Sequence, residues 1–229
     1  GKRRVVLVAP TGFGKTIVIG ELARSHISLT TGRVLVLVHR RELVQQTVAK
    51  LRNASVDHVG VLQAGTSLDE TARVIVASIQ TIIARGVFPT ATLVLWDECH
   101  HCPAATFALV HAHYAAAVHC GFSATPIRND NKSLSGMFDA MVIGASVRQL
   151  TALNLLTRSE VLCLGEPTRD LALSPVDAYT RYTPGRAAVV FAASVAHARA
   201  IADEFVSLGI RAACVDGETG DDVRDDVLA

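Results

Sequence analysis

Residues 9–16 read Ala-Pro-Thr-Gly-Phe-Gly-Lys-Thr and directly follow the apolar run Val-Val-Leu-Val at positions 5–8. A buried strand that opens into a glycine-containing loop and then a helix is the arrangement of a phosphate-binding P-loop. Gly12 and Gly14 allow the backbone to turn sharply and to bring its N–H groups close to phosphate oxygens. The positive end of the following helix, which we expect to begin near Lys15, adds to this attraction. The stretch therefore predicts a phosphate site between a strand and a helix.

Two side chains at the end of this stretch carry the chemistry of such a loop. The Lys15 ammonium can reach the β and γ phosphates of a nucleotide, and the Thr16 hydroxyl can bind Mg²⁺. The strict pattern begins with glycine, so Ala9 is its one substitution. The alternative interpretation is a glycine turn that precedes an ordinary helix by chance. We predict that the nucleotide lies against six consecutive residues: Thr11, Gly12, Phe13, Gly14, Lys15 and Thr16.

A second hydrophobic run, Leu-Val-Leu-Trp at positions 93–96, ends in the adjacent carboxylates Asp97 and Glu98. In P-loop enzymes a carboxylate at such a strand end holds magnesium, usually through water. A second carboxylate can orient the attacking water and accept its proton. Neighbouring side chains on a strand point in opposite directions, but both can face the loop where the chain curls at the strand end. We therefore assign Asp97 to magnesium and Glu98 to the role of base; the alternative is a solvated acidic turn.

The next four residues, Cys-His-His-Cys at 99–102, also resemble a metal-binding cluster. A structural zinc site needs four converging ligands, usually supplied by two such pairs that are far apart in the sequence. The remaining cysteines, Cys120, Cys163 and Cys214, stand singly, so no second pair is present. Zinc is therefore the weaker alternative, and we expect Cys102 to fill space in the core. An odd number of cysteines in so apolar a chain favours a reducing compartment.

Bulk composition excludes some classes of protein and leaves others open. The chain has 229 residues, of which 50% are hydrophobic, and its formal net charge is +1. No apolar run reaches the ~18–20 residues that a membrane span requires, and the basic residues 2–4 precede only a short strand rather than a signal peptide. We expect a cytoplasmic protein without a membrane partner. Because the net charge is small, any nucleic-acid surface must be local.

Short apolar runs alternate with helical patterns over the first 144 residues. Runs rich in valine and leucine with little polar alternation suit a parallel sheet that is covered on both faces. The pattern predicts a doubly wound α/β domain. The predicted strands are residues 5–9, 33–39, 56–62, 74–77, 93–97 and 118–122.

The remaining sequence predicts a connector and a second, smaller α/β unit. We place the first domain at residues 1–144, a connecting helix and linker at 145–186, and the second unit at 187–229. The second unit has two candidate strands, at 187–191 and 211–215. Two strands are marginal by themselves, so this unit either leans on the first domain or is completed by residues beyond 229. We expect the natural chain to continue, because its last residues read as a helix without a stop signal.

Taken in order, five motifs resemble those of superfamily 2 helicases and translocases of the broad DEAD/DEAH class. They are residues 9–16, Leu-Val-Leu-Val-His-Arg-Arg-Glu-Leu at 35–43, Ala-Ser-Ile-Gln-Thr at 77–81, Asp-Glu-Cys-His at 97–100, and Ser-Ala-Thr at 123–125. The resemblance covers nearly the whole chain and is closest to bacterial and phage ResIII-type or RadD-like helicases. The first and fourth motifs are specific, whereas the others gain their weight from order and spacing.

The resemblance implies a P-loop NTPase with a RecA-like parallel sheet, followed by part of a second RecA-like domain. It implies ATP and Mg²⁺ as ligands, with Lys15, Asp97 and Glu98 as catalytic residues. His100, Ser123 and Thr125 would couple the nucleotide state to the nucleic-acid side. Arg40, Gln80 and Thr81 would contact the phosphate backbone of a nucleic-acid strand. Each assignment has an alternative. Arg40 could be a surface charge at a helix start, Gln80 and Thr81 a helix cap, His100 a packed core residue, and the stretch with Ser123 and Thr125 a plain exit from a strand into a turn.

The resemblance also leads us to expect an ATP-dependent motor that moves on or unwinds single- or double-stranded nucleic acid, with DNA favoured over RNA. The family's γ-phosphate arginines would lie beyond residue 229, so a fragment should hydrolyse ATP slowly; such an arginine contributes ~10³–10⁵ in rate. The family's adenine-reading glutamine would precede residue 1. The alternatives are a duplex translocase subunit of a restriction or repair system, an ATP-regulated nucleic-acid-binding protein without unwinding activity, and a P-loop kinase.

Overall fold

A computed structural model of the chain describes residues 3–39, 42–63, 65–127, 133–161 and 174–228. Its contacts divide the chain into two compact units, residues 1–158 and residues 159–229. Within the described ranges, no helix combines the length and the apolar character needed to cross a membrane.

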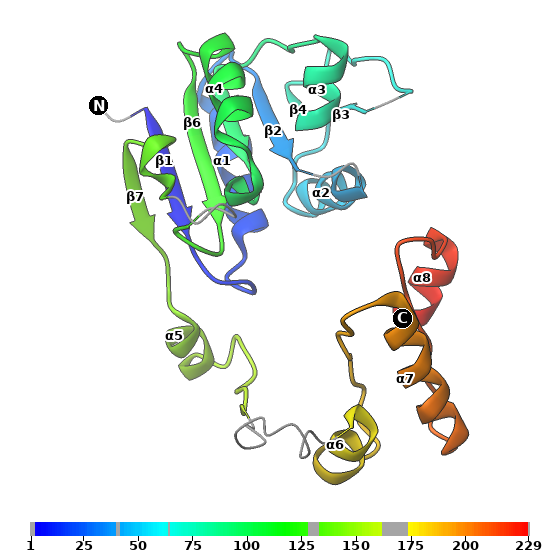
Figure 1. Cartoon of the computed structure of the whole chain (residues 1–229). Helices are drawn as coiled ribbons and strands as arrows, with labels where there is room; N and C mark the ends of the chain where they lie inside the picture. The colour runs from blue at the N-terminus through cyan, green and yellow to red at the C-terminus, as the bar shows by residue number, and fades with distance from the viewer. Residues whose placement is uncertain (1–2, 40–41, 64, 128–132, 162–173, 229) are drawn as a thin grey trace. The chain divides into compact units, whose positions relative to one another are not determined.

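The first unit is built on one parallel sheet (Figure 1). Its strands, as far as the described residues show, are β1 (Arg4–Val8), β2 (Val34–Val38), β3 (Val59–Leu62), β4 (Val74–Ser78), β5 (Leu93–Trp96), β6 (Val118–Ser123) and β7 (Ala140–Ile143). They lie in the order β3-β4-β2-β5-β6-β1-β7, and every neighbouring pair is parallel. The carboxyl ends of all these strands therefore meet at one edge of the sheet.

Helices cover both faces of the sheet. They are α1 (Lys15–Leu29), α2 (Glu42–Asn53), α3 (Ile79–Arg85) and α4 (Ala104–His113). Helix α5 (Val147–Ala152) follows β7, and two short 3₁₀ turns are η1 (Cys99–His101) and η2 (Leu134–Gly136). Alternate residues of β2 serve opposite cores. Val36 packs in a cluster with residues of α1 and α2, whereas Leu35 and Leu37 pack in a cluster that includes Phe107 of α4. The predicted doubly wound α/β architecture is confirmed.

The six predicted strands all form, with ends that shift by one to three residues. The sequence did not predict β7, which follows Phe138 and lies at the edge of the sheet beside β1. Three of its four residues are exposed. The connecting helix predicted within 145–186 is α5, which ends at Ala152.

The second unit contains α6 (Pro175–Tyr182), α7 (Val195–Ser207) and α8 (Asp221–Leu228). Its small core joins Val176 of α6 to Ile201 and Phe205 of α7. The prediction of strands at 187–191 and 211–215 is wrong: neither segment is a strand. Parallel strands need hydrogen-bonded neighbours on the sheet, and two short segments provide too few. Helix α6 also replaces part of the expected linker.

Candidate functional site

The P-loop adopts the backbone that the glycine pattern predicts. Gly12 has φ +84° and Gly14 has φ +90°, a left-handed region that favours glycine over residues with a Cβ. Gly14 is the N-cap of α1 and supplies no side-chain hydrogen bond to the helix. The first N–H groups of a helix have no acceptor within the helix itself. They therefore point from α1 toward the space where a phosphate would bind.

Lys15 joins the loop to the acidic end of β5. Its side chain is 8% exposed. Its Nζ donates to the Ala9 carbonyl oxygen at 3.2 Å and lies 3.5 Å from Glu98 Oε1. Strands β1 and β5 are separated in the sheet by β6 alone, so the long lysine side chain can span the distance. The structure thus brings together the loop and the carboxylate pair that the sequence predicts to share one pocket.

The two carboxylates lie where β5 ends and the chain curls. Glu98 has φ +46°, and its N–H donates to Asp97 Oδ1 at 3.1 Å. Burial, with a smaller contribution from the neighbouring Glu98 charge, raises the pKa of Asp97. Glu98 Oε2 is buried and has no hydrogen-bond partner among the described residues. A buried acceptor of this kind needs a partner, and a water bound in the pocket would provide one.

A hydrogen-bonded network connects the ends of β5 and β6. Ser123 Oγ donates to the Thr125 carbonyl oxygen at 2.6 Å and accepts from the Thr125 N–H at 3.1 Å. His100 Nδ1 lies 3.0 Å from the same hydroxyl oxygen. A hydroxyl has one proton, so His100 Nδ1 must be the donor in this contact. The three residues predicted to couple the nucleotide site to its surroundings therefore lie in one network.

The environment of His100 favours a neutral imidazole beside the carboxylates. Burial lowers the pKa of His100, and the neighbouring His101 lowers it further. Its Nδ1 is also 3.3 Å from Glu98 Oε2, without the geometry of a hydrogen bond. The His101 ring is tilted by 40° to the His100 ring, with centroids 3.9 Å apart, and the ring of His39, which follows β2, stacks on His101 with centroids 5.3 Å apart. The sequence analysis quoted His39 within the motif at 35–43 and His101 within the candidate zinc cluster at 99–102, but it assigned neither residue a role in the nucleotide site.

The structure gives the zinc alternative no support. Cys99 and Cys102 are both buried, and burial raises the pKa of the Cys99 thiol. The part of the chain that the structure describes holds no group of three or more His, Cys, Asp or Glu side chains that could bind a metal ion. Cys99 and Cys102 instead belong to the core beneath α4.

The three residues predicted to contact nucleic acid differ in their exposure to solvent. Arg40 lies outside the described residues. Gln80 is exposed on α3, whereas Thr81 is buried and its N–H donates to Ser78 Oγ at 3.1 Å. Ser78 is thus the N-cap of α3, which fits the alternative interpretation of this motif as a helix cap.

One contact with the P-loop had no signal in the sequence. Leu156, four residues beyond the end of α5, packs against Gly12 so closely that a Cβ on Gly12 would overlap its Cδ2 atom. Phe13 and Ala9 pack in the same way against Gly144, which follows β7. The segment after β7 therefore forms one side of the P-loop.

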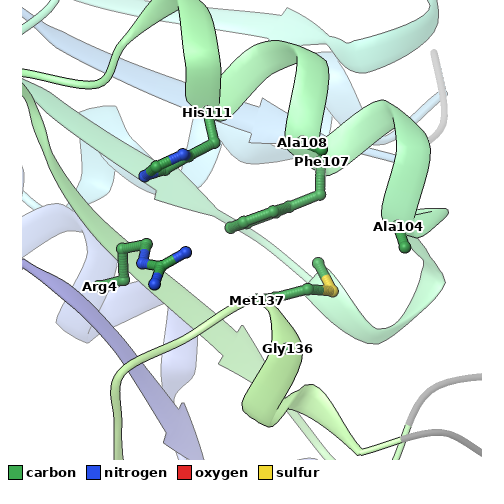
Figure 2. A pocket seen from close by; sticks show the side chains of 7 residues that line it. All are labelled: Arg4, Ala104, Phe107, Ala108, His111, Gly136 and Met137. Atoms are coloured by element: carbon green, nitrogen blue, oxygen red, sulfur yellow. The ribbon is translucent and has the colours of Figure 1, made fainter.

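A separate cavity of about 190 Å³ lies away from these groups. Figure 2 shows Arg4, Phe107, His111 and Met137 around it. Arg4 begins β1, so this cavity is at the amino edge of the sheet, opposite the edge that holds Lys15 and Glu98. The Arg4 guanidinium is already paired with Asp139. The candidate catalytic residues, Lys15 and Glu98, therefore lie at the carboxyl edge of the sheet and not in this cavity.

Comparisons with known proteins agree with this geometry. A family model described as type III restriction enzyme, res subunit (ResIII), matches residues 1–128, which is more than half of the chain. A 51.5 kDa protein of a Lactococcus phage (isolate 7-9) is 29% identical over 249 residues, covering 97% of this chain and 51% of that protein. A Saccharomyces cerevisiae protein provisionally named as the ATP-dependent helicase IRC3 is 31% identical over 168 residues, covering 66% of this chain and 24% of that protein.

Among solved structures, the UvsW helicase from bacteriophage T4 matches with a TM-score of 0.55 and 21% identity, over 62% of this chain and 55% of that one. This likeness shows that the sheet has a RecA-like helicase fold. The chain spans about half the length of the phage relative and about a quarter of the yeast relative. Because the family match includes both the P-loop and the carboxylates at 97–98, this chain belongs to the ResIII family.

Proposed function

We propose that this protein is an ATP-hydrolysing motor that couples hydrolysis to movement on nucleic acid or to its unwinding, with DNA favoured over RNA. The observation that carries the proposal is the 3.5 Å approach of Lys15 Nζ to Glu98 Oε1. It brings the group that would hold the phosphates next to the group that would activate water. A structural protein or a simple binding module does not hydrolyse ATP, so it has no need of the pair formed by Lys15 and Glu98.

The residues of the site divide the work of hydrolysis. The loop N–H groups and Lys15 bind the phosphates, with the Lys15 ammonium exchanging its contact to Ala9 for one to the γ phosphate. A magnesium ion would be held by Thr16 and Asp97, where it offsets the negative charge of the phosphates. Glu98 Oε2, the buried acceptor without a hydrogen-bond partner, takes the proton from the attacking water.

The network around Ser123 provides a route from hydrolysis to movement. His100 contacts both Glu98 and Ser123, so a change at Glu98 reaches the backbone of Thr125 through a single hydroxyl. Gln80, which is exposed on α3, and Arg40 contact the phosphate backbone of the nucleic acid, whereas the buried Thr81 holds the start of the helix that carries Gln80. Residues 187–229 serve as part of a second RecA-like domain.

A second candidate is a translocase that moves on duplex DNA without separating its strands. The family description, which names a restriction enzyme subunit, favours it. Both candidates predict backbone contacts, so binding should weaken steeply with salt and show little sequence preference. A strand-displacement assay run beside a duplex-translocation assay separates them.

The test is the ATPase rate of the full-length protein with single-stranded DNA, duplex DNA and RNA added in turn. We expect DNA to stimulate hydrolysis more than RNA does. Lys15→Ala should abolish ATP hydrolysis, and Glu98→Gln should bind ATP but not turn it over. Arg52→Ala and Glu21→Gln, which change exposed charged residues of α2 and α1, are the controls. A normal ATPase rate in Lys15→Ala or Glu98→Gln would overturn the proposed site.

A further inference from the structure

Two histidines beside the candidate site have no role in the proposed hydrolysis. His101 follows His100 in η1, and the centroids of the two rings lie 3.9 Å apart. The ring of His39 stacks on His101, with planes 27° apart and centroids at 5.3 Å. The three rings form a continuous row from the end of β2 to His100.

The sheet and the 3₁₀ turn bring these rings together. Strands β2 and β5 are neighbours, and the Asp97 N–H donates to the Leu37 carbonyl oxygen at 2.9 Å. His39, two residues beyond Leu37, therefore leaves the sheet beside η1. Successive residues of a 3₁₀ turn point about 120° apart, so neighbours in such a turn do not face each other by default. The close approach of His100 and His101 therefore means that both rings turn to the same side.

The backbone that carries His100 and His101 is held at both ends of the turn. Cys99 and Cys102 are buried and belong to the core. The His101 N–H donates to the Glu98 carbonyl oxygen at 3.0 Å, and the Cys102 N–H donates to the Cys99 carbonyl oxygen at 3.1 Å. The position of the turn is thus fixed by its backbone, whereas the orientation of the His100 ring depends on what its side chain contacts.

The orientation of the His100 ring decides whether its contacts form. Its Nδ1 donates to Ser123 Oγ at 3.0 Å, because the hydroxyl proton is given to the Thr125 carbonyl oxygen. The same nitrogen lies 3.3 Å from Glu98 Oε2. Turning the ring about its Cβ–Cγ bond would move Nδ1 off the line to Ser123, and a hydrogen bond weakens steeply as its alignment is lost. A ring packed against His100 opposes this rotation.

We propose that His101 positions the His100 imidazole for ATP hydrolysis, and that His39 supports His101 from the end of β2. This inference rests on the proposed function, because the positioned ring lies beside Glu98, the proposed base. His101 acts through His100 rather than on the phosphates. Its loss should therefore slow turnover without weakening the binding of ATP, which depends on Lys15 and the loop N–H groups.

The first measurement is kcat and KM for ATP, made on the full-length protein with DNA present. His101→Ala should lower kcat about two- to tenfold, as expected for the loss of one aromatic ring contact, and leave KM unchanged. His101→Phe keeps a flat ring at this position and should retain most of the wild-type kcat. The matched control is His113→Ala, which removes an exposed histidine ring that stacks on Phe88 at the end of α4. It should change neither constant.

A pair of variants tests the contribution of His39. His39→Ala should lower kcat by no more than His101→Ala does. The double variant should be no slower than His101→Ala alone, because His39 acts only through the ring that has been removed. If the two losses multiply, the residues act separately and the support from His39 is wrong.

NMR of the His100 ring nitrogens provides a reading that a purely structural role would not change. A neutral imidazole carries its proton on one of its two nitrogens, and the contact with Ser123 requires it on Nδ1. We expect wild type and His113→Ala to show the Nδ1-protonated form. His101→Ala should show a mixture that includes the Nε2-protonated form. An unchanged Nδ1-protonated form in His101→Ala would overturn the proposal.

The outcomes distinguish this proposal from the function on which it rests. A wild-type protein that hydrolyses no ATP would overturn both. A wild-type protein that hydrolyses ATP, with His101→Ala keeping its kcat or changing KM alone, would overturn the positioning role and leave the motor intact. Equal losses of kcat in His101→Ala and His101→Phe would also overturn it, because a flat ring would then not be what orients His100.

Discussion

His119 is an imidazole held neutral inside the sheet. It is fully buried, and its Nδ1 accepts a hydrogen bond from Trp96 Nε1 at 3.1 Å. Its Nε2 lies 3.1 Å from the Tyr114 carbonyl oxygen, to which it must donate. Both ring nitrogens therefore have fixed roles. Protonation would place a second donor opposite the Trp96 N–H, in a position without solvent.

We expect this residue to make the first unit less stable in mild acid. Burial lowers the pKa of His119 from 6.5 to about 4, so the unfolded chain binds the proton more readily. Stability is fully present above pH 6.5 and is lost as the pH falls toward 4. The shift corresponds to about 2 kcal/mol between pH 7 and pH 5. Urea unfolding followed by fluorescence of Trp96, the single tryptophan, measures it.

The control for this prediction is His119→Gln, which has an acceptor and a donor but does not titrate. Burial also lowers the pKa of His26, His100 and His111, so the variant should keep a residual pH dependence of the same sign. The difference between wild type and variant in the stability lost from pH 7 to pH 5 is the contribution of His119. Equal losses of stability in both proteins would contradict the assignment.

Gly121 in β6 is required by close packing rather than by its backbone angles. A Cβ there would overlap the Phe138 ring and lie 3.0 Å from Cys99 Sγ. We expect Gly121→Ala to lower the free energy of unfolding by about 1–3 kcal/mol, as overpacking does. Gly136→Ala is the control, because a Cβ at Gly136 meets nothing within 4 Å. If the two variants have the same urea midpoint, the core around Gly121 is looser than the structure indicates.

The residues of the candidate site differ in how far the sequence could reveal them. Lys15 and Glu98 were predictable because each belongs to a short motif whose chemistry is local. Leu156 was not, because its contact with Gly12 joins residues that are more than 140 positions apart. An ordinary leucine after a helix has no periodicity or spacing that indicates a ligand.

At the scale of elements, the buried strands were the most predictable part of the fold. Strand β2 has five residues, all buried, and its unbroken apolar run is what a central parallel strand requires. Strand β7 has four residues that are mostly exposed. Its run Ala-Met-Val-Ile is too short to be told from a loop, and only its pairing with β1 makes it a strand.

The motif at 77–81, at the start of helix α3, can stabilise the fold, bind nucleic acid, or do both, and two substitutions separate these roles. Ser78 Oγ caps the helix and is fully buried, so Ser78→Ala should lower the free energy of unfolding by about 1 kcal/mol or somewhat more. Gln80 is exposed in the first turn of the helix, so Gln80→Ala should leave stability unchanged and weaken DNA binding. Urea unfolding and DNA titration at two salt concentrations give the two readings.

The two variants serve as controls for each other. Loss of DNA affinity in Ser78→Ala at a temperature where the protein remains folded would mean that the cap itself shapes the nucleic-acid surface. If Gln80→Ala binds DNA as tightly as wild type, Gln80 does not contact the nucleic acid and the proposed role of this motif is wrong.

For the whole molecule, the second unit shows why strand propensity alone is a poor guide. Residues 187–191 read Ala-Ala-Val-Val-Phe, a run that favours a strand. In the structure Phe191 is 94% exposed, and the run has no strand partner in the part of the chain that is described. Strand formation depends on neighbours that lie elsewhere in the chain, whereas α7 needs only its own residues and the Ser194 cap.

Amide hydrogen exchange on the full chain measures this difference. The N–H groups of β2 pair with β4 and β5 on both sides, so they should exchange only when the first unit unfolds. Residues 187–191 and 211–215 lack strand partners and should exchange within the shortest labelling times. Helix α7, with Ile201 and Phe205 buried against α6, should lie between these limits. Protection of 187–191 equal to that of β2 would mean that these residues are paired in solution, as a second RecA-like sheet requires.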